Sequence, residues 1–220
     1  MLIHPWDAAT SESEWREWLA GTDRFGVLAV ASRDGAAPFL VPTHFTLQGN
    51  RILMHLARPN PVWPHLEVAE EVRLAVIGDY AYVPSTWRAK AGDALANGVP
   101  TSYYATVQFV CQPTVVDDPD AKVEILRAQF ADQQPQGGHA EVSVESEPYG
   151  PMLPGIRGLY LDIVQVQAKF KYDDQKPQAH REHVAAQLDQ RSAGVDRSAA
   201  RQQRRRLGVI GEWKQKRSQT

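Results

Sequence analysis

Residues 25–57 read FGVLAVASRDGAAPFLVPTHFTLQGNRILMHLA. Three apolar runs, at 25–32, 38–47 and 51–57, are separated only by short connections that contain Gly, Asp and Asn. Such connections join antiparallel neighbours, because a parallel pair needs a much longer crossover. The segment therefore predicts three strands of an antiparallel sheet.

The rest of the chain continues this pattern. We expect strands at 72–78 and 81–87, joined by a turn at Gly78-Asp79, and two long strands at 101–116 and 158–172. There is no glycine-rich phosphate loop of either common type, which argues against dinucleotide-binding and P-loop folds. Many strands with short turns favour a closed or nearly closed β-barrel with peripheral helices over a parallel βαβ sheet.

Helices interrupt and follow the strands. Asp118 can cap one of them, because its side chain can accept a hydrogen bond from the first turn. We assign residues 1–175 to one domain and 176–220 to a C-terminal helical, basic tail. The expected helices lie at 11–20, at 66–71, inserted at about 118–132, and at 180–191.

The composition, with 43% hydrophobic and 23% charged residues, is that of a globular protein. The longest uncharged apolar run, 25–32, is too short to cross a bilayer, and the N-terminus does not resemble a signal peptide. The single cysteine, Cys111, excludes an internal disulfide and a cysteine-based metal cage. These features predict a cytoplasmic protein that does not bind membranes.

Charge is unevenly distributed. Residues 1–174 carry 13 Lys and Arg against 22 Asp and Glu, whereas residues 175–220 carry 11 against 4. The tail arginines Arg201 and Arg204 to Arg206 could contact DNA phosphates without reading sequence, or could simply be the solvated face of a helix. No helix-turn-helix, zinc finger or other DNA-reading module is recognisable.

The segment HLARPNPVW (55–63) carries the most chemical information. A strand is expected to end at Ala57, and Asn60-Pro61 suits the start of a helical turn. Guanidinium groups bind phosphate oxygens in pairs, and free N–H groups at a helix start attract anions. Arg58 is therefore a candidate phosphate ligand, although an arginine at a strand end often only reaches solvent.

HLARPNPVW, followed by GDYAYVPSTW (78–87) and GVPTSYYATVQF (98–109), resembles the PaiB-type family, whose members are called FMN-binding negative transcriptional regulators. AKFKYDDQKPQAHREHVAAQL (168–188) is similar to the closing strand and helix of that family. The resemblance implies an FMN-binding split β-barrel, related in fold to pyridoxamine-phosphate oxidases. It also implies a homodimer with FMN at the subunit interface.

The resemblance implies roles for individual residues. Arg58 and Asn60 would hold the phosphate, while Trp63 and Trp87 are equally well explained by core packing. If the protein is an enzyme, the first candidates for substrate contact are His44, Tyr103 and Tyr104. The cofactor-binding residues expected on this basis are Arg58, Asn60, Trp63, Tyr82, Val83, Ser85, Trp87, Thr101, Lys169 and Lys171.

The chain departs from the family on the flavin side. Pro42 begins Pro-Thr-His-Phe where the family commonly has His-Leu-Pro-Phe, and Ser102 stands where it commonly has Trp. Gln108 replaces a usual histidine. The phosphate site should be kept while the ring contacts differ, and the smaller Ser102 leaves room for a larger flavin or a deazaflavin.

Three functions follow as hypotheses. The first is a redox-linked negative transcriptional regulator that binds FMN, and the second is a flavin-dependent oxidoreductase acting on a small molecule or on a reduced nicotinamide. The third is a simple flavin or haem carrier. No catalytic residue can be named. His180 and His183 are spaced for one helix face, which we interpret as solvated rather than metal-binding.

Overall fold

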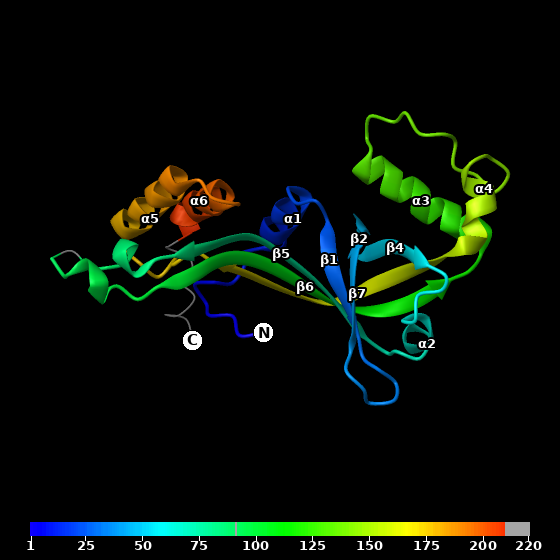
Figure 1. The fold of residues 1–220 in the computed structure, drawn as a ribbon, viewed down its shortest axis with the longest axis horizontal. Coiled ribbons are helices and arrows are strands. Elements are labelled where there is room, and N and C mark those ends of the chain that lie inside the picture. The colour runs from blue at the N-terminus through cyan, green and yellow to red at the C-terminus, as the bar shows by residue number, and fades with distance from the viewer. Residues whose placement is uncertain (91, 210–220) are drawn as a thin grey trace. The chain divides into compact units, whose positions relative to one another are not determined.

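The computed structural model describes residues 1–90 and 92–209 (Figure 1). Seven strands form one sheet in the order β2-β1-β5-β6-β7-β4-β3. β1 pairs antiparallel with β2 and β5, and β4 pairs antiparallel with β3 and β7, which confirms the predicted antiparallel sheet. The sheet ends at β2 and β3 and is not a closed barrel. The strands are β1 (Phe25–Val30), β2 (Phe39–His44), β3 (Thr46–Gln48), β4 (Arg51–Ala57), β5 (Val72–Val83), β6 (Thr101–Val116) and β7 (Ile156–Lys171).

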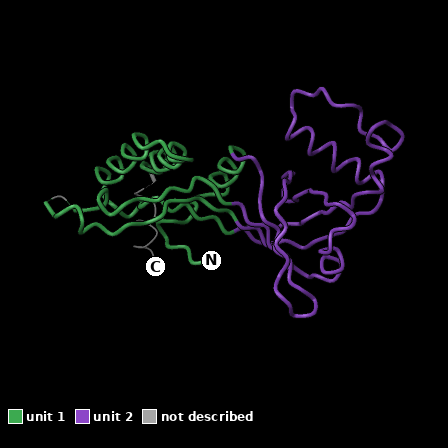
Figure 2. The backbone as a smooth tube through the Cα atoms, in the orientation of Figure 1, with its two compact units in different colours: residues 1–21, 77–107, 167–220 green, residues 22–76, 108–166 purple. Residues whose placement is uncertain are grey.

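The chain divides into two compact units (Figure 2). Strands β5, β6 and β7 each contribute residues to both units. Unit 1 contains residues from the N-terminus, the middle and the C-terminal tail of the chain, and unit 2 contains the segments between them. Unit 1 is Met1–Gly21, Ile77–Val107 and Gln167–Thr220, and unit 2 is Thr22–Val76 and Gln108–Val166.

Unit 2 buries both faces of β4. Met54 on one face is fully buried, and Leu53 on the other packs with Val116 and Ile125. Ile125 belongs to α3 (Pro119–Gln133), which packs against β4 (Figure 1). The predicted cap of this helix is confirmed, because Asp118 accepts a hydrogen bond from Ala121 N at 2.9 Å.

Among its described residues, unit 1 has three helices of more than two turns: α1 (Glu12–Ala20), α5 (Gln178–Arg191) and α6 (Asp196–Arg205). α5 and α6 pack side by side (Figure 1). The sequence suggested only a charged tail for α6, because most of its positions are polar. Ala199 and Ala200 are fully buried and form a narrow apolar face of α6. A face this narrow is difficult to detect in a sequence in which most positions are polar.

Short helices join the longer elements. The helix expected at 66–71 is found earlier in the chain, where Pro64 fits the first turn of α2. In the described part of the chain, no helix combines the length and the apolar character needed to span a bilayer. The short helices are α2 (Trp63–Leu66), η1 (Ser85–Trp87), η2 (Leu95–Asn97), α4 (Tyr149–Met152), η3 (Leu153–Gly155) and η4 (Arg206–Val209).

The predicted turn at Gly78-Asp79 is wrong, because β5 runs through it without a break. Asp79 instead adopts a left-handed conformation with φ of 53°. Every second side chain of β5 is buried up to Val76. The alternation begins again at Ala81, but it is shifted by one residue relative to the first part of the strand. Asp79 is fixed there because its carboxylate accepts a hydrogen bond from Trp18 Nε1 at 2.7 Å.

A buried ionic network joins distant segments of unit 1. The Asp174 carboxylate accepts hydrogen bonds from Arg206 Nε at 2.6 Å and from Arg181 Nη2 at 2.7 Å. Arg206 also bonds Glu14 of α1 and donates to the carbonyl oxygen of Ala8 at 3.0 Å. Asp174, Arg181 and Arg206 are at most 1% exposed. The network therefore holds the N-terminal segment, the end of β7 and the C-terminal helices together.

Asp174→Asn should destabilise the protein strongly, because it leaves two buried guanidinium groups without their shared carboxylate. Breaking a buried ion pair in this way costs about 3–5 kcal/mol. Asp189→Asn is the matched control, since it removes only the partly exposed pair with Arg204 and should cost less than about 1 kcal/mol. Urea unfolding of both variants measures the difference. Equal free energies of unfolding would show that the network does not stabilise unit 1.

Candidate functional site

Arg58 lies directly after β4, on the surface of unit 2. Its Nε donates to Pro154 O at 2.7 Å, and its Nη2 donates to Asp117 Oδ1 at 3.0 Å. Among the described residues, Nη1 has no hydrogen-bond partner. The side chain is 45% exposed. Arg58 is thus held in one orientation while one of its nitrogens can still donate to an anion.

The backbone of residues 58–64 offers no free donor for a phosphate. Three of these residues are prolines, which have no N–H group. The N–H groups of Arg58, Asn60 and Val62 all bond within the protein, and that of Trp63 lies 3.5 Å from the carbonyl oxygen of Asn60. The cradle of N–H groups expected at this helix start is therefore not formed. The available donors are Arg58 Nη1 and Asn60 Nδ2, which has no partner in the described part of the chain.

Asp117 is shared between two arginines. Arg157 donates to it from Nη2 at 2.6 Å and from Nε, and donates from Nη1 to Glu67 at 2.7 Å. The hydrogen bonds from Arg157, with those from Arg58, hold the pKa of the Asp117 carboxyl below its usual range. A phosphate at Arg58 would therefore compete with a fully ionised carboxylate.

Trp63 packs inside unit 2. It is 3% exposed, its Nε1 donates to Ala57 O at 3.0 Å, and the Arg157 guanidinium lies 5.0 Å from its ring centre. The described contacts of this side chain are with the protein's own core and surface residues. Its predicted role in cofactor binding stays a prediction.

Four of the expected residues meet in unit 1. Lys171 Nζ donates to Thr101 Oγ1 at 2.9 Å, and Lys169 Nζ donates to Leu2 O at 2.9 Å. The Tyr104 ring centre lies 5.6 Å from Lys169 Nζ and 5.8 Å from Lys171 Nζ. Cations at these distances interact favourably with the face of an aromatic ring. Of the two lysines, Lys169 is the less accessible, since it is 7% exposed.

Arg191, which the sequence analysis did not select, links two further expected residues. Its guanidinium lies 4.8 Å from the Trp87 ring centre, and its Nη1 donates to Tyr82 O at 2.8 Å. Val83 is fully buried, backbone and side chain alike, and Ser85 begins η1. No sequence signal identified Arg191, because the contact depends on the path of α5.

The suspected substrate residues differ in access. Tyr103 is fully buried, and its hydroxyl donates to Asp173 Oδ2 at 3.1 Å. Burial, together with the Asp173 charge, raises the pKa of Tyr103 far above its usual value. His44 is exposed, and its ring centre lies 5.6 Å from that of His55. Partial burial lowers the pKa of His44. Of these two candidate substrate residues, His44 is accessible to a ligand. Tyr103 is buried and bonded within the protein, which is typical of a structural role.

The expected site residues belong to different units (Figure 2). The residues of the phosphate end and His44 belong to unit 2, and the residues expected beside the flavin ring belong to unit 1. Within unit 1, the contacts described above join Lys171 with Thr101, both Lys169 and Lys171 with Tyr104, and Arg191 with Trp87 and Tyr82.

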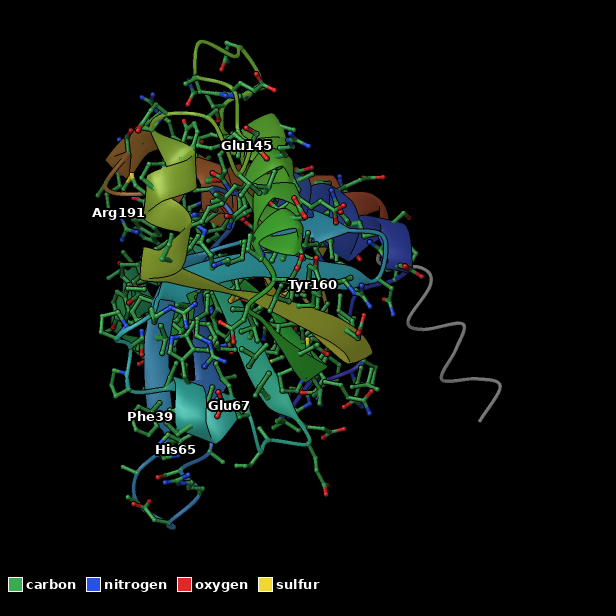
Figure 3. The ribbon with its side chains drawn as sticks, turned by 90° about the vertical axis from the view of Figure 1, so that its right-hand side faces the viewer. Phe39, His65, Glu67, Glu145, Tyr160 and Arg191 are labelled. Atoms are coloured by element: carbon green, nitrogen blue, oxygen red, sulfur yellow. The ribbon has the colours of Figure 1, made fainter. Side chains whose placement is uncertain are left out.

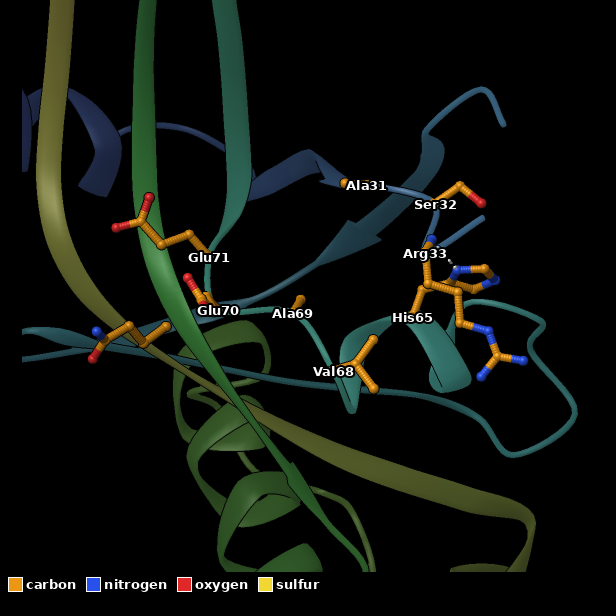
Figure 4. Close-up of a pocket in the computed structure, with 9 residues that line it drawn as sticks. Ala31, Ser32, Arg33, His65, Val68, Ala69, Glu70 and Glu71 are labelled. Carbon is orange, nitrogen blue, oxygen red and sulfur yellow. Dashed lines mark hydrogen bonds between the residues drawn. The ribbon is translucent and has the colours of Figure 1, made fainter. Parts of the chain in front are cut away.

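A cavity of about 480 Å³ lies in unit 2 between the 31–33 segment and the 65–71 segment (Figure 4). His65 Nδ1 accepts a hydrogen bond from Arg33 N at 3.1 Å, and the His65 ring packs on Phe39 at 4.4 Å between ring centres (Figure 3). None of the expected cofactor residues lines this cavity, so we do not assign the cofactor to it.

Residues 1–165 match a protein family described as “Putative FMN-binding domain”. The chain belongs to this FMN-binding family. Its cofactor is FMN. The finer resemblance to the PaiB type stays a prediction. A search of curated protein sequences gave no match.

Solved structures share the fold of this family member. One is a flavocytochrome from Azotobacter vinelandii, at 17% identity and a TM-score of 0.58, covering 76% of this chain and 70% of that one. Another is an FAD and heme binding protein from Mycobacterium smegmatis, at 18% identity and a TM-score of 0.56, covering 74% and 73%. Identities this low show the fold alone. They confirm the predicted split barrel with peripheral helices.

The donors at Arg58 and Asn60 suit the phosphate end of FMN. A guanidinium and an amide both donate N–H groups, which is the chemistry that phosphate oxygens require. The backbone of residues 58–64 has no free N–H group for the phosphate. Phosphate binding here would therefore depend on the side chains of Arg58 and Asn60, and the negative charge of Asp117 would oppose it. The family member can therefore be tested at this site with single substitutions.

Arg58→Ala should weaken FMN binding by about 10- to 100-fold, the loss expected for a charge-assisted hydrogen bond of about 1.5–3 kcal/mol. Asp117→Asn should strengthen it by about fivefold, because removing a nearby like charge is worth about 1 kcal/mol. Quenching of flavin fluorescence on titration of the apoprotein measures both constants.

Arg51→Ala is the matched control for these variants, since it removes an arginine of β4 whose partner is the exposed Asp162. Its FMN affinity should equal that of the unmodified protein. If Arg58→Ala also leaves the affinity unchanged, the phosphate is bound elsewhere.

Proposed function

We propose that this protein is a redox protein that uses FMN on a small-molecule substrate, with the phosphate of FMN held by Arg58 and Asn60. The observation that carries this proposal is the pair of unpartnered donors at these residues, among the described residues, in a chain whose residues 1–165 match an FMN-binding family. Bound FMN supplies hydride and electron transfer, while the protein supplies orientation and electrostatics.

The tail arginines favour this proposal over direct binding to DNA. Arg206 is buried, Arg205 pairs with Glu14 at 2.9 Å, and Arg204 pairs with Asp189 at 2.6 Å. Arginines that are buried or paired within the protein are less available for DNA phosphates. Of the four tail arginines, Arg201 is the exception among the described residues, since it is exposed and bonds only Ser198. A redox-linked regulator of the PaiB type, our second candidate, would then act through a partner protein rather than through this cluster.

The purified protein should be yellow, with flavin bands in its visible spectrum, and should consume reduced nicotinamide or another small reductant when an electron acceptor is present. A Soret band would indicate haem instead. A flavin spectrum without turnover would contradict the oxidoreductase proposal and support a regulator that acts through a partner protein. A salt-sensitive shift of duplex DNA would instead show direct DNA binding and contradict the inference drawn from the tail arginines. A colourless protein that does not take up added FMN would contradict both.

We also propose that the protein is a homodimer with FMN at the subunit interface. Exposed apolar side chains on β5 support this proposal: Ile77 is 68% exposed, Tyr80 is 55% exposed and Tyr82 is 49% exposed. Large exposed apolar side chains on one strand are a feature of surfaces that bind a partner. A second copy of the chain would remove these side chains from water.

Sedimentation should therefore give twice the chain mass of 24.5 kDa. Ile77→Asp should weaken the dimer at least tenfold, because it introduces a charge into the proposed apolar interface. Val68→Asp changes an equally exposed residue of unit 2, which is 62% exposed, and should leave the dimer intact. A monomer at micromolar concentration would contradict the dimer while leaving the FMN titration as a separate result.

A further inference from the structure

Unit 1 contains a cavity of about 680 Å³ at the start of α5. This volume lies in the range of small-molecule sites, which is about 300–1,000 Å³. Trp87 is the only expected cofactor residue among the described residues that line it. The lining comes from the end of η1 and the residues that follow it, from the two residues before α5, and from the first two turns of α5.

The cavity is positively charged. Lys90 and Lys176 line it, and both are exposed. In the described part of the chain, neither ammonium group forms a salt bridge, and no Asp or Glu lines the cavity. Two uncompensated ammonium groups beside one opening attract an anion.

The start of α5 adds to this charge. Pro177 stands at the N-cap and provides no side-chain hydrogen bond, and the first turn contains no acidic residue. The N–H groups of residues 178–180 have no hydrogen-bond partner among the described residues. Ala179 and His180, which belong to this turn, line the cavity. Unsatisfied N–H groups and the positive end of the helix dipole therefore face the same opening as the two lysines.

Two side chains in the wall are incompletely satisfied. Arg88 Nη2 donates to Asp173 Oδ2 at 2.8 Å, but Arg88 Nε is buried and has no hydrogen-bond partner within the described residues. His180 Nε2 is likewise buried without a partner, at 3.6 Å from the same carboxylate oxygen. Tyr103 donates to this same oxygen, so three side chains share Asp173 Oδ2.

The remaining wall is apolar and partly flat. The Trp87 ring is fixed by the Arg191 guanidinium 4.8 Å from its centre, and Ala89 and Pro177 complete the apolar surface. An aromatic ring held in this way can pack against a planar apolar group. The site thus combines donors for an anion with a surface for a ring.

We propose that this cavity binds a small organic phosphate monoester with a planar apolar group, as a ligand additional to FMN. A phosphate dianion matches the many donors better than a carboxylate, because it presents three oxygens to two lysines, the helix start and His183. The inference goes beyond the proposed function, which places the phosphate of FMN at Arg58 and Asn60, and it assigns Trp87 to this second ligand rather than to the flavin ring.

Phenyl phosphate is the probe, titrated by calorimetry into the full-length protein loaded with one equivalent of FMN. We expect one site per chain. Lys90→Ala/Lys176→Ala should weaken phenyl phosphate binding at least tenfold and leave the FMN affinity unchanged. Arg197→Ala/Arg201→Ala removes two exposed cations of α6 outside the cavity and should change neither affinity.

Other results would overturn the proposal. These are no phenyl phosphate binding at millimolar concentration, equal binding by the two double variants, or displacement of phenyl phosphate by a second equivalent of FMN. Inorganic phosphate should bind more weakly than phenyl phosphate, and equal affinity would overturn the planar part of the ligand. Unchanged FMN affinity in Arg58→Ala would overturn the phosphate site at Arg58 and would leave this cavity untouched, so the two proposals fail separately.

Discussion

The buried carboxylate of Asp174 and the two guanidinium groups that bond it organise unit 1. Taking these charges out of water costs several kcal/mol for each ion, and further hydrogen bonds are needed to offset that cost. Arg181 lacks some of them, because its Nε and Nη1 are buried without a hydrogen-bond partner among the described residues. Arg206 meets the requirement by reaching Glu14 and the carbonyl oxygen of Ala8 as well. Because its partners lie almost two hundred residues earlier in the chain, this one arginine brings the C-terminal helices and the N-terminus into one unit. The position of α5, and with it the basic cavity at the start of α5, depends on this network.

A second constraint acts on the sheet itself. Asp79 changes the phase of β5, so that Tyr80 and Tyr82 are exposed where uninterrupted alternation would bury them. The strained conformation is held by the hydrogen bond from Trp18 on α1. A local pattern of Gly followed by Asp is typical of a turn, and only the partner on another element makes it a change of phase within a strand.

At the phosphate end of the candidate site, the chemistry of individual residues predicted the side-chain donors but not the state of the backbone. Sequence selected Arg58 and Asn60, and both retain a donor that can bind an anion. The sequence also suggested free N–H groups at the helix start, but in the structure the N–H groups of residues 58–64 are already bonded within the protein. The competing carboxylate of Asp117 follows Arg58 by 59 residues. No local pattern could have placed it there.

The sequence by itself determined the antiparallel sheet, the capped helix after Asp118 and membership of an FMN-binding family. These depend on period, short turns and local motifs, which nearby residues encode. The tertiary structure alone decided which charges are paired, that α6 is a packed helix with Arg206 buried at its end, and that Lys90 and Lys176 line one cavity with Trp87. Those outcomes require contacts between residues far apart in the chain, because an ion pair or a cavity exists only where separate elements meet.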